Sequence, residues 1–332
     1  MKALILAPFQ AEFLEKLRRK VEVTYQSWLD TRRLLSPEEL IERIQKENIS
    51  IIVLEADFIF EEVFEAADKL RFVGICRGST NNVDIEAATK HGVVVVNTPG
   101  RNAVAVAELT LGLMLSLARR IPALHSMVKS GEWVNPVEPY LSLRGIELAG
   151  KIAGIIGLGA IGSEVARRLQ ALEMKLLGYD PYLGSEKMSR VGVSPVSLEE
   201  LLKESDFITI HCPVSPQTVG LIDRSKIALM KSSAYLINTA GWEIVDEGAL
   251  LEALKQRRIA GAAFDVYQTH PIPQQSPFLK LDNVVLTPHI GGATDGTIER
   301  YSKIMTQEIE RFLEGKRPQN LVNPEVWKEN VR

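Results

Sequence analysis

The 332-residue sequence predicts an α/β fold made of two doubly wound parallel-sheet domains. Two observations predict it. Short apolar runs typical of buried strands alternate with amphipathic helix patterns along most of the chain, an order that produces parallel sheets covered by helices. The alternation stops in a looser stretch around Pro136 and Pro139 and restarts at residue 151 with KIAGIIG. The restart indicates a second domain with its own hydrophobic core.

Local signals predict the elements of the first block. A capping box, Ser36-Pro37-Glu38-Glu39, marks the start of one helix. Another helix is expected to begin near Asp84 and to end at Gly92, and an amphipathic pattern indicates a further helix over 10–20. Apolar runs of the length of buried parallel strands occur at 2–7, 50–55, 71–76 and 93–97.

A long helix is expected over 102–120, before the looser stretch, and contains AELTLGLMLSLA. This helix is apolar on most sides, so we expect it to be buried, either in its own domain or against a second subunit. The last predicted helix, 295–314, has a regular apolar face and must pack on one of the two domains. Strands of the second block are expected at 151–157, 175–180, 206–212, 234–240, 260–266 and 284–289.

Composition and charge narrow the class of protein. The formal net charge of −3 gives no electrostatic reason to expect a nucleic acid or an anionic membrane as a partner. The apolar run 109–118 is too short to span a bilayer, and the amino terminus lacks the pattern of a signal peptide. Cys76 and Cys212 lie far apart and have no metal-ligand spacing. We therefore expect a cytoplasmic protein with free thiols and without a metal site.

A glycine-rich turn opens the second block, and its sequence is Gly157-Leu158-Gly159-Ala160-Ile161-Gly162. It follows a predicted strand and starts a predicted helix, so the helix amino terminus can face the phosphates of a dinucleotide. Asp180 ends the next strand, 23 residues after Gly157. Its carboxylate can accept hydrogen bonds from ribose hydroxyls and would repel a 2′-phosphate, which favours NAD over NADP. The second block is therefore predicted to be a Rossmann-type cofactor domain.

Three histidines follow predicted strands of this cofactor domain. His211 precedes Pro213, His270 follows AGAAFDV, and His289 ends VVLTPH. Ligands of open parallel sheets bind at the carboxyl ends of the strands, where all three lie. Exchange between an alcohol and a carbonyl group requires a proton donor and acceptor. His289 is the predicted catalytic residue, His211 is expected to line the cofactor site, and the role of His270 stays open.

Several motifs together resemble the D-isomer-specific 2-hydroxyacid dehydrogenases, in particular their phosphoglycerate dehydrogenase-like branch. The resemblance implies a Rossmann-like NAD-binding domain, residues 102–292, inserted into a flavodoxin-like substrate-binding domain of residues 1–101 and 293–332. It implies a homodimer through the NAD-binding domains, and the end of the chain at 332 predicts that the regulatory carboxyl-terminal domains of longer members are absent. The motifs are NVDIEAATKHGVVVVNTPGRNAVAVAELTLGLMLSLAR, GLGAIG with YDP, HCP, NTA with VDEGALLEAL, AGAAFDV and TPHIGGAT.

The resemblance also implies roles for individual residues. Members of the family transfer hydride between NAD and C2 of a small anionic 2-hydroxy or 2-keto acid. His289 matches the acid/base histidine, and Asp265 matches the aspartate that binds the nicotinamide amide. Backbone groups of 76–80, which include Gly78 and Ser79, match the loop that helps to hold the substrate carboxylate. Further positions are expected at the cofactor: Pro213, Thr239, Ala240 and Gly291.

The chain departs from the family pattern at two catalytic positions. Gly241 stands where the family has the carboxylate-binding arginine, and His270 stands where it has the glutamate that orients the histidine. An imidazole cannot supply the negative charge of that glutamate. Trp242 stands where the family has glycine, and its side chain could fill the space that the arginine needs.

Two other arginines could replace the missing cation. Arg77 lies in the predicted substrate loop and Arg101 at the first crossing between the domains, although either could be merely a solvated side chain. We therefore keep two hypotheses. One is an NAD-dependent oxidoreductase with altered substrate anchoring, and the other is an NAD(H)-binding sensor or interaction protein with little dehydrogenase activity. A different NAD-linked reaction is a third, weaker alternative.

Overall fold

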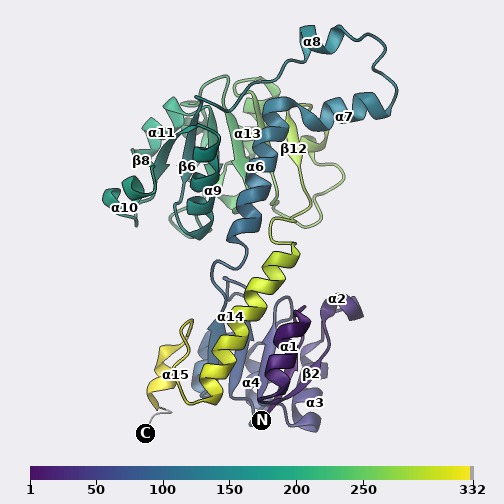
Figure 1. The fold of residues 1–332 in the computed structure, drawn as a ribbon, viewed down its shortest axis with the longest axis vertical. Coiled ribbons are helices and arrows are strands. Elements are labelled where there is room, and N and C mark those ends of the chain that lie inside the picture. Colours follow the sequence, from purple (N-terminus) through teal and green to yellow (C-terminus); the bar gives the residue numbers. More distant parts are fainter. Residues whose placement is uncertain (330–332) are drawn as a thin grey trace. The chain divides into compact units, whose positions relative to one another are not determined.

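The computed structural model of the protein describes residues 1–329, which fold into two compact units (Figure 1). Unit 1 contains Met1–Arg101 together with the segment from Thr294 onward, and unit 2 contains Asn102–Ala293. Each unit has one sheet in which all paired strands are parallel, with helices on both faces. The predicted fold class is therefore confirmed. Among residues 1–329, no helix is both long and apolar enough to cross a membrane.

Unit 1 has a five-stranded sheet in the order β2-β1-β3-β4-β5. Its strands are β1 (Lys2–Ile5), β2 (Glu22–Tyr25), β3 (Ile51–Leu54), β4 (Phe72–Ile75) and β5 (Val94–Asn97). Its helices are α1 (Ala11–Arg18), α2 (Trp28–Thr31), α3 (Pro37–Glu47), α4 (Glu61–Ala66), α5 (Ile85–Lys90), α14 (Asp295–Leu313) and α15 (Pro324–Glu329). The predicted capping box is present: Ser36 Oγ accepts from Glu39 N, and Glu39 Oε2 accepts from Ser36 N.

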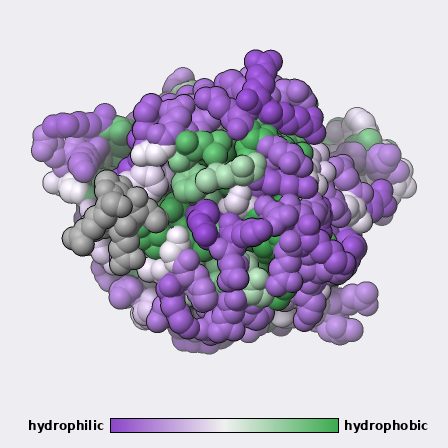
Figure 2. Space-filling view, turned by 90° about the horizontal axis from the view of Figure 1, so that it is seen from below, coloured by the Kyte–Doolittle hydropathy of each residue, from purple (hydrophilic) through white to green (hydrophobic). Residues whose placement is uncertain are grey.

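The last long helix, α14, packs on unit 1. It buries Tyr301, Met305 and Ile309 in the same core as Phe13 and Leu17 of α1. Figure 2 views the end of unit 1 that carries the amino terminus, where hydrophilic side chains surround a smaller hydrophobic area. Because the amino terminus leads into β1 and all strands are parallel, this end is the amino-terminal edge of the sheet. Loops that follow the strands lie at the opposite edge.

Unit 2 has a seven-stranded sheet in the order β12-β11-β10-β9-β6-β7-β8. Its strands are β6 (Ile152–Ile156), β7 (Lys175–Tyr179), β8 (Ser194–Pro195), β9 (Phe207–Ile210), β10 (Tyr235–Asn238), β11 (Gly261–Phe264) and β12 (Val284–Leu286). Its α-helices are α6 (Ala103–Arg119), α7 (Ile121–Lys129), α8 (Glu138–Ser142), α9 (Ala160–Ala171), α10 (Ser185–Arg190), α11 (Leu198–Glu204), α12 (Arg224–Ile227) and α13 (Glu247–Lys255). The strand order reverses between β6 and β9, and the carboxyl ends at such a reversal form the usual ligand crevice of doubly wound sheets.

The predicted long helix, α6, is buried largely within its own unit. It packs against α9 and against β10 and β11, with Leu113 and Met114 in the core. The segment 121–147, which we call the arm, leaves this core and carries α7 and α8 away from the sheet (Figure 1). Large apolar side chains are exposed on the arm, namely Ile121, Val128, Trp133, Val134, Val137, Tyr140 and Leu141.

Candidate active site

The glycine turn between β6 and α9 has the geometry that a dinucleotide phosphate requires. Gly157 has φ +88°, and a Cβ there would lie 2.6 Å from the backbone nitrogen of Cys212. A Cβ on Gly162 would collide with the Gly157 carbonyl oxygen. At Gly159, by contrast, a Cβ would meet nothing within 4 Å, so open space faces the amino terminus of α9. The first N–H groups of a helix have no intrahelical acceptor, so Ala160 and its neighbours can bind a pyrophosphate there.

Asp180 connects the end of β7 to this turn. Its Oδ2 accepts from Leu158 N at 2.9 Å, and its Oδ1 accepts from Tyr182 N at 2.9 Å and Leu183 N at 3.1 Å. Three backbone donors thus fix the orientation of the carboxylate. The negative charge is held next to the glycine turn, which is the place where the sequence predicts it.

His211 lies at the end of β9 and is only 9% exposed. Its Nε2 is 2.8 Å from Thr209 Oγ1, while Nδ1 is buried without a hydrogen-bond partner among residues 1–329. Burial lowers the pKa of His211 to about 3, so the ring is neutral near pH 7. Pro213 follows on an exposed loop, where its carbonyl accepts from Thr218 Oγ1 at 2.6 Å.

The loop after β10 is fixed by the buried side chain of Asn238. Its Oδ1 accepts from Ala240 N at 3.0 Å and Gly241 N at 3.3 Å, and its Nδ2 donates to Gly241 O at 2.8 Å. Thr239 Oγ1 lies 3.4 Å from Thr110 Oγ1 of α6. The sequence did not single out Asn238, although asparagine at the end of a strand commonly closes a turn with its own backbone.

Gly241 has extended backbone, and a Cβ there would collide with Cγ2 of Val214. Val214 is 44% exposed on the loop after β9. The side chain that occupies the space beside Gly241 is therefore that of Val214. The expectation that Trp242 fills this space is wrong.

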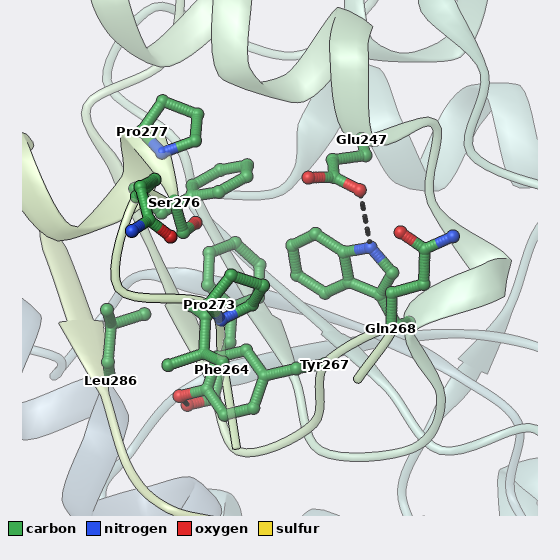
Figure 3. A pocket seen from close by; sticks show the side chains of 12 residues that line it. Glu247, Phe264, Tyr267, Gln268, Pro273, Ser276, Pro277 and Leu286 are labelled. Atoms are coloured by element: carbon green, nitrogen blue, oxygen red, sulfur yellow. Dashed lines mark hydrogen bonds between the residues drawn. The ribbon is translucent and has the colours of Figure 1, made fainter. Parts of the chain in front are cut away.

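Trp242 points instead into the core of unit 2. It is 7% exposed and packs edge-on against Phe264 and Phe278, with ring centroids 5.1 and 5.4 Å away. Its Nε1 donates to Glu247 Oε2 at 3.0 Å, the dashed line in Figure 3. A pocket of about 270 Å³ adjoins it, lined by Trp242, Glu247, Phe264, Tyr267, Gln268, Ile272, Pro273, Gln275, Ser276, Pro277, Phe278 and Leu286 (Figure 3). The indole is a packing residue, and the pocket lining also contains the aromatic rings of Phe264, Tyr267 and Phe278.

Asp265 holds the loop that carries His289. It is 1% exposed, and its Oδ1 accepts from Thr287 Oγ1 at 2.6 Å and Ile290 N at 2.9 Å, while Oδ2 accepts from Gly291 N at 2.7 Å. Within this loop His289 has φ +56°, in the left-handed region that non-glycine residues rarely adopt. The bonds on both sides of His289 stabilise this conformation.

His289 and His270 form a hydrogen-bonded pair of imidazoles. His289 Nδ1 lies 2.8 Å from His270 Nε2, and the ring centroids are 4.6 Å apart. One ring donates and the other accepts. Tyr267, which the sequence did not single out, lies edge-on to His270 at 6.0 Å and donates from its hydroxyl to Thr287 O at 2.8 Å. Burial raises the pKa of Tyr267 to about 12, so its hydroxyl remains a donor at neutral pH.

The predicted substrate-binding residues lie in unit 1, after β4 and β5. Arg101 Nη1 pairs with Glu55 Oε1 at 2.7 Å, and the two side chains are only 13% and 16% exposed. Arg77 is half-buried, and within residues 1–329 its guanidinium makes no hydrogen bond or ion pair. Gly78 O accepts from Asn97 Nδ2 at 2.8 Å, and Ser79 Oγ donates to Asn81 Oδ1 at 3.0 Å.

Comparison with known proteins identifies the family of unit 2 and finds relatives that cover most of the chain. Residues 111–291, inside unit 2, match the family model "D-isomer specific 2-hydroxyacid dehydrogenase, NAD binding domain". A D-3-phosphoglycerate dehydrogenase of Methanocaldococcus jannaschii is 41% identical over 299 residues, 90% of this chain and 56% of that protein. A glyoxylate reductase of Korarchaeum cryptofilum is 39% identical over 293 residues, 88% of each chain. The crystal structure of the TT0316 protein from Thermus thermophilus superposes with a TM-score of 0.82 at 34% identity, covering 97% of this chain and 100% of that one.

The fold and the glycine turn define a protein that binds a nicotinamide dinucleotide. More particularly, the chain belongs to the D-isomer specific 2-hydroxyacid dehydrogenase family, since its model matches more than half of the sequence. The resemblance inferred from the motifs, including the phosphoglycerate dehydrogenase-like branch, is confirmed. The chain spans 56% and 59% of the length of two phosphoglycerate dehydrogenases that it matches.

Proposed function

We propose that the protein is an NAD-dependent oxidoreductase that interconverts a small anionic 2-hydroxy acid and the corresponding 2-keto acid. The observation that carries this proposal is the position of His289. It follows the strand β12 of the dinucleotide-binding sheet, in a rare backbone conformation that Asp265 holds from both sides. Strain of this kind concentrates at functional sites. Bound NADH would supply the hydride for reduction of the keto acid.

His289 is the proposed acid/base. With Nδ1 hydrogen-bonded to His270, its Nε2 is the atom that gives a proton to the carbonyl oxygen during reduction and removes one from the hydroxyl during oxidation. When His289 is protonated, Nδ1 must donate, so His270 Nε2 must accept and its ring is neutral. His270 therefore orients the catalytic ring as a carboxylate would, without adding a charge.

The cofactor is proposed to be NAD and to bind along the carboxyl edge of unit 2. Asp180 would face the adenosine ribose, and its charge disfavours a 2′-phosphate. The other proposed cofactor contacts are Gly157, Gly159, Ala160, Ile161, Gly162, His211, Pro213, Thr239, Ala240, Asp265 and Gly291. Both oxygens of Asp265 already accept hydrogen bonds from the His289 loop. A bond from the nicotinamide amide would add to this positioning role.

Unit 1 is proposed to bind the substrate, and unit 2 is proposed to bind the cofactor. Backbone groups of Gly78 and Ser79 lie after β4, at the carboxyl edge where ligands bind in such sheets. The glyoxylate reductase among the relatives supports a small 2-keto acid. The free cysteines, Cys76 and Cys212, support a cytoplasmic location.

A second copy of the chain is proposed to cover the arm and so form a homodimer through unit 2. Trp133 is 53% exposed and Tyr140 is 77% exposed there. Light scattering should give twice the monomer mass for the parent and the monomer mass for Trp133→Asp, Tyr140→Asp. The control Tyr182→Asp changes an equally exposed aromatic side chain outside the arm and should remain dimeric. A monomeric parent would refute this part of the proposal.

The deciding experiment is NADH oxidation by the purified protein with a panel of 2-keto acids that includes glyoxylate, pyruvate and hydroxypyruvate. Turnover with at least one acid, and tighter binding of NADH than of NADPH, are expected. Gly241 and His270, which replace an arginine and a glutamate of the family pattern, favour the second candidate, an NAD(H)-binding sensor or interaction protein. Tight NADH binding without turnover of any acid would support that candidate.

A further inference from the structure

Loops at the carboxyl edge of unit 2 offer no cation for a substrate carboxylate. No lysine or arginine occurs in the loop segments 157–159, 180–184, 211–223, 239–246, 265–276 and 287–293. A carboxylate that is taken out of water needs a charged or hydrogen-bonding partner. Because the proposed acid/base and cofactor loops do not provide the charge, the cation has to come from another part of the chain.

The carboxyl edge of unit 1 brings three charges together on neighbouring strands. Glu55 follows β3, Arg77 follows β4 and Arg101 follows β5, and these strands are adjacent in the sheet. The guanidinium of Arg101 already has partners within unit 1. It pairs with Glu55 at 2.7 Å and lies 5.3 Å from the centroid of the Tyr301 ring. The ion pair and the ring fix Arg101 and neutralise its charge.

Among the residues that the structure describes, the guanidinium of Arg77, unlike that of Arg101, is not paired. Within residues 1–329 its half-buried guanidinium has no acceptor. Burial, followed by repulsion from Arg101, lowers the pKa of Arg77, while Glu55 acts in the other direction. An arginine that is partly desolvated beside a second arginine is unfavourable unless an anion joins it. A Cβ on the following residue, Gly78, would meet only Pro99 Cα, at 3.8 Å, so a ligand can approach the backbone there.

We propose that Arg77 is the carboxylate anchor of the substrate site, and that the Glu55–Arg101 pair restricts this site to acids with a single negative charge. The inference rests on the proposed function and deepens it. Two arginines and one glutamate leave one positive charge, which a bidentate carboxylate matches. A phosphorylated 2-keto acid carries about 1.5 to 2 further negative charges, which would face Glu55 without a partner. The substrate class is therefore a small, unphosphorylated 2-keto acid.

The anchor is tested with Arg77→Met and Arg77→Lys in the full-length protein. Arg77→Met should lower kcat/KM for glyoxylate at least about tenfold, mainly through KM, and Arg77→Lys should restore part of it, while the Kd for NADH changes less than about twofold. The control is Arg71→Met at the amino end of the same strand, where Nη1 donates to the carbonyl oxygens of Asp68 and Leu70. It should match the parent. A kcat/KM for Arg77→Met within twofold of the parent overturns the assignment.

Selectivity is tested with hydroxypyruvate and 3-phosphohydroxypyruvate, which differ only in the phosphate. The parent should prefer hydroxypyruvate at least about tenfold in kcat/KM, and Glu55→Gln should reduce this preference severalfold. The double variant Glu55→Gln, Arg101→Met removes one charge of each sign, keeps the net charge at one and should restore the parent's preference. A parent that prefers the phosphorylated acid, or a double variant that behaves like Glu55→Gln, contradicts the charge argument. Thermal unfolding of each variant verifies that it is folded.

A binding measurement separates this inference from the proposed function. Pyruvate is titrated calorimetrically into the protein with NAD⁺, which cannot reduce it. The parent should bind pyruvate at least fivefold more tightly than Arg77→Met, whether or not turnover is seen with NADH. Equal binding, or no binding by the parent, refutes the anchor. Failure to reduce any 2-keto acid refutes the proposed function while leaving the binding result intact.

Discussion

The two units build the same kind of parallel sheet and use its carboxyl edge differently. At the edge of unit 2 the carboxylates of Asp180 and Asp265 are each bound by three hydrogen-bond donors, and a hydrogen bond joins His270 and His289. At the edge of unit 1 the three charges of Glu55, Arg77 and Arg101 meet, and only two of them are paired. The comparison indicates that unit 2 orients groups through the backbone, whereas unit 1 provides charge.

The largest effect is expected from removing the proposed acid/base at the carboxyl edge of unit 2. His289→Gln removes the proposed acid/base and should lower kcat for keto-acid reduction by about 10²- to 10⁴-fold. The Kd for NADH should change less than about threefold, because the glycine turn is untouched. His91→Gln, on an exposed histidine of unit 1, is the control and should retain full activity. If His289→Gln keeps more than a tenth of the activity, another group supplies the proton.

The second prediction concerns the buried neutral ring of His211. Its pKa is about 3 in the folded protein and 6.5 for an ordinary histidine, so the stability it contributes is complete above pH 6.5 and is lost as the pH falls from 6.5 toward 3. At pH 4.5 the loss should be about 2–3 kcal/mol. The free energy of unfolding, measured in urea at pH 7.5 and pH 4.5, should fall more in the parent than in His211→Gln. Equal falls would show that His211 is not buried as described.

Periodicity was sufficient to predict the fold because each buried strand is a short apolar run and each long helix has a regular apolar face. The observed strands are shorter than the predicted ones by as many as three residues at the carboxyl end, as in β1 and β12. They end where the regular pairing with the adjacent strand ends. The arm and its short helices were not predicted. Helix α2, with four residues, makes about one turn, which is too short for an apolar pattern.

The candidate site was only partly predictable, because contacts between distant segments decide it. Nothing in the motif around Gly241 indicates that Val214 lies next to it or that Trp242 turns into the core. The sequence likewise left Arg77 and Arg101 equivalent. Their difference depends on Glu55, which precedes them by more than twenty residues and is brought near by the strand order β3-β4-β5.

The third prediction removes the cation Arg77 from unit 1 and places an arginine at position 241 of unit 2. In the Arg77→Met background, Gly241→Arg with Val214→Ala removes the side chain that an arginine would meet and adds a guanidinium to unit 2. A charge-assisted hydrogen bond contributes roughly 1.5–3 kcal/mol, so kcat/KM for glyoxylate should recover at least about tenfold. Gly241→Met with Val214→Ala is the uncharged control and should recover nothing. Trp242→Gly is unsuitable for this test, because deleting that core side chain should cost about 3–5 kcal/mol of stability.

The smallest expected effect tests whether a carboxylate at position 270 changes the pH dependence of the reaction. His270→Glu places a carboxylate where an imidazole now meets His289 Nδ1. Reduction of a keto acid requires the protonated form of His289, so its rate falls as rising pH removes that proton. A carboxylate stabilises the imidazolium, and the fall in kcat/KM should move about one unit to higher pH. His270→Gln accepts a hydrogen bond without a charge and should leave the position of the fall near that of the parent. If the profile of His270→Glu overlays that of the parent, His270 does not act on the catalytic ring, and its hydrogen bond to His289 has only a structural role at the edge of unit 2.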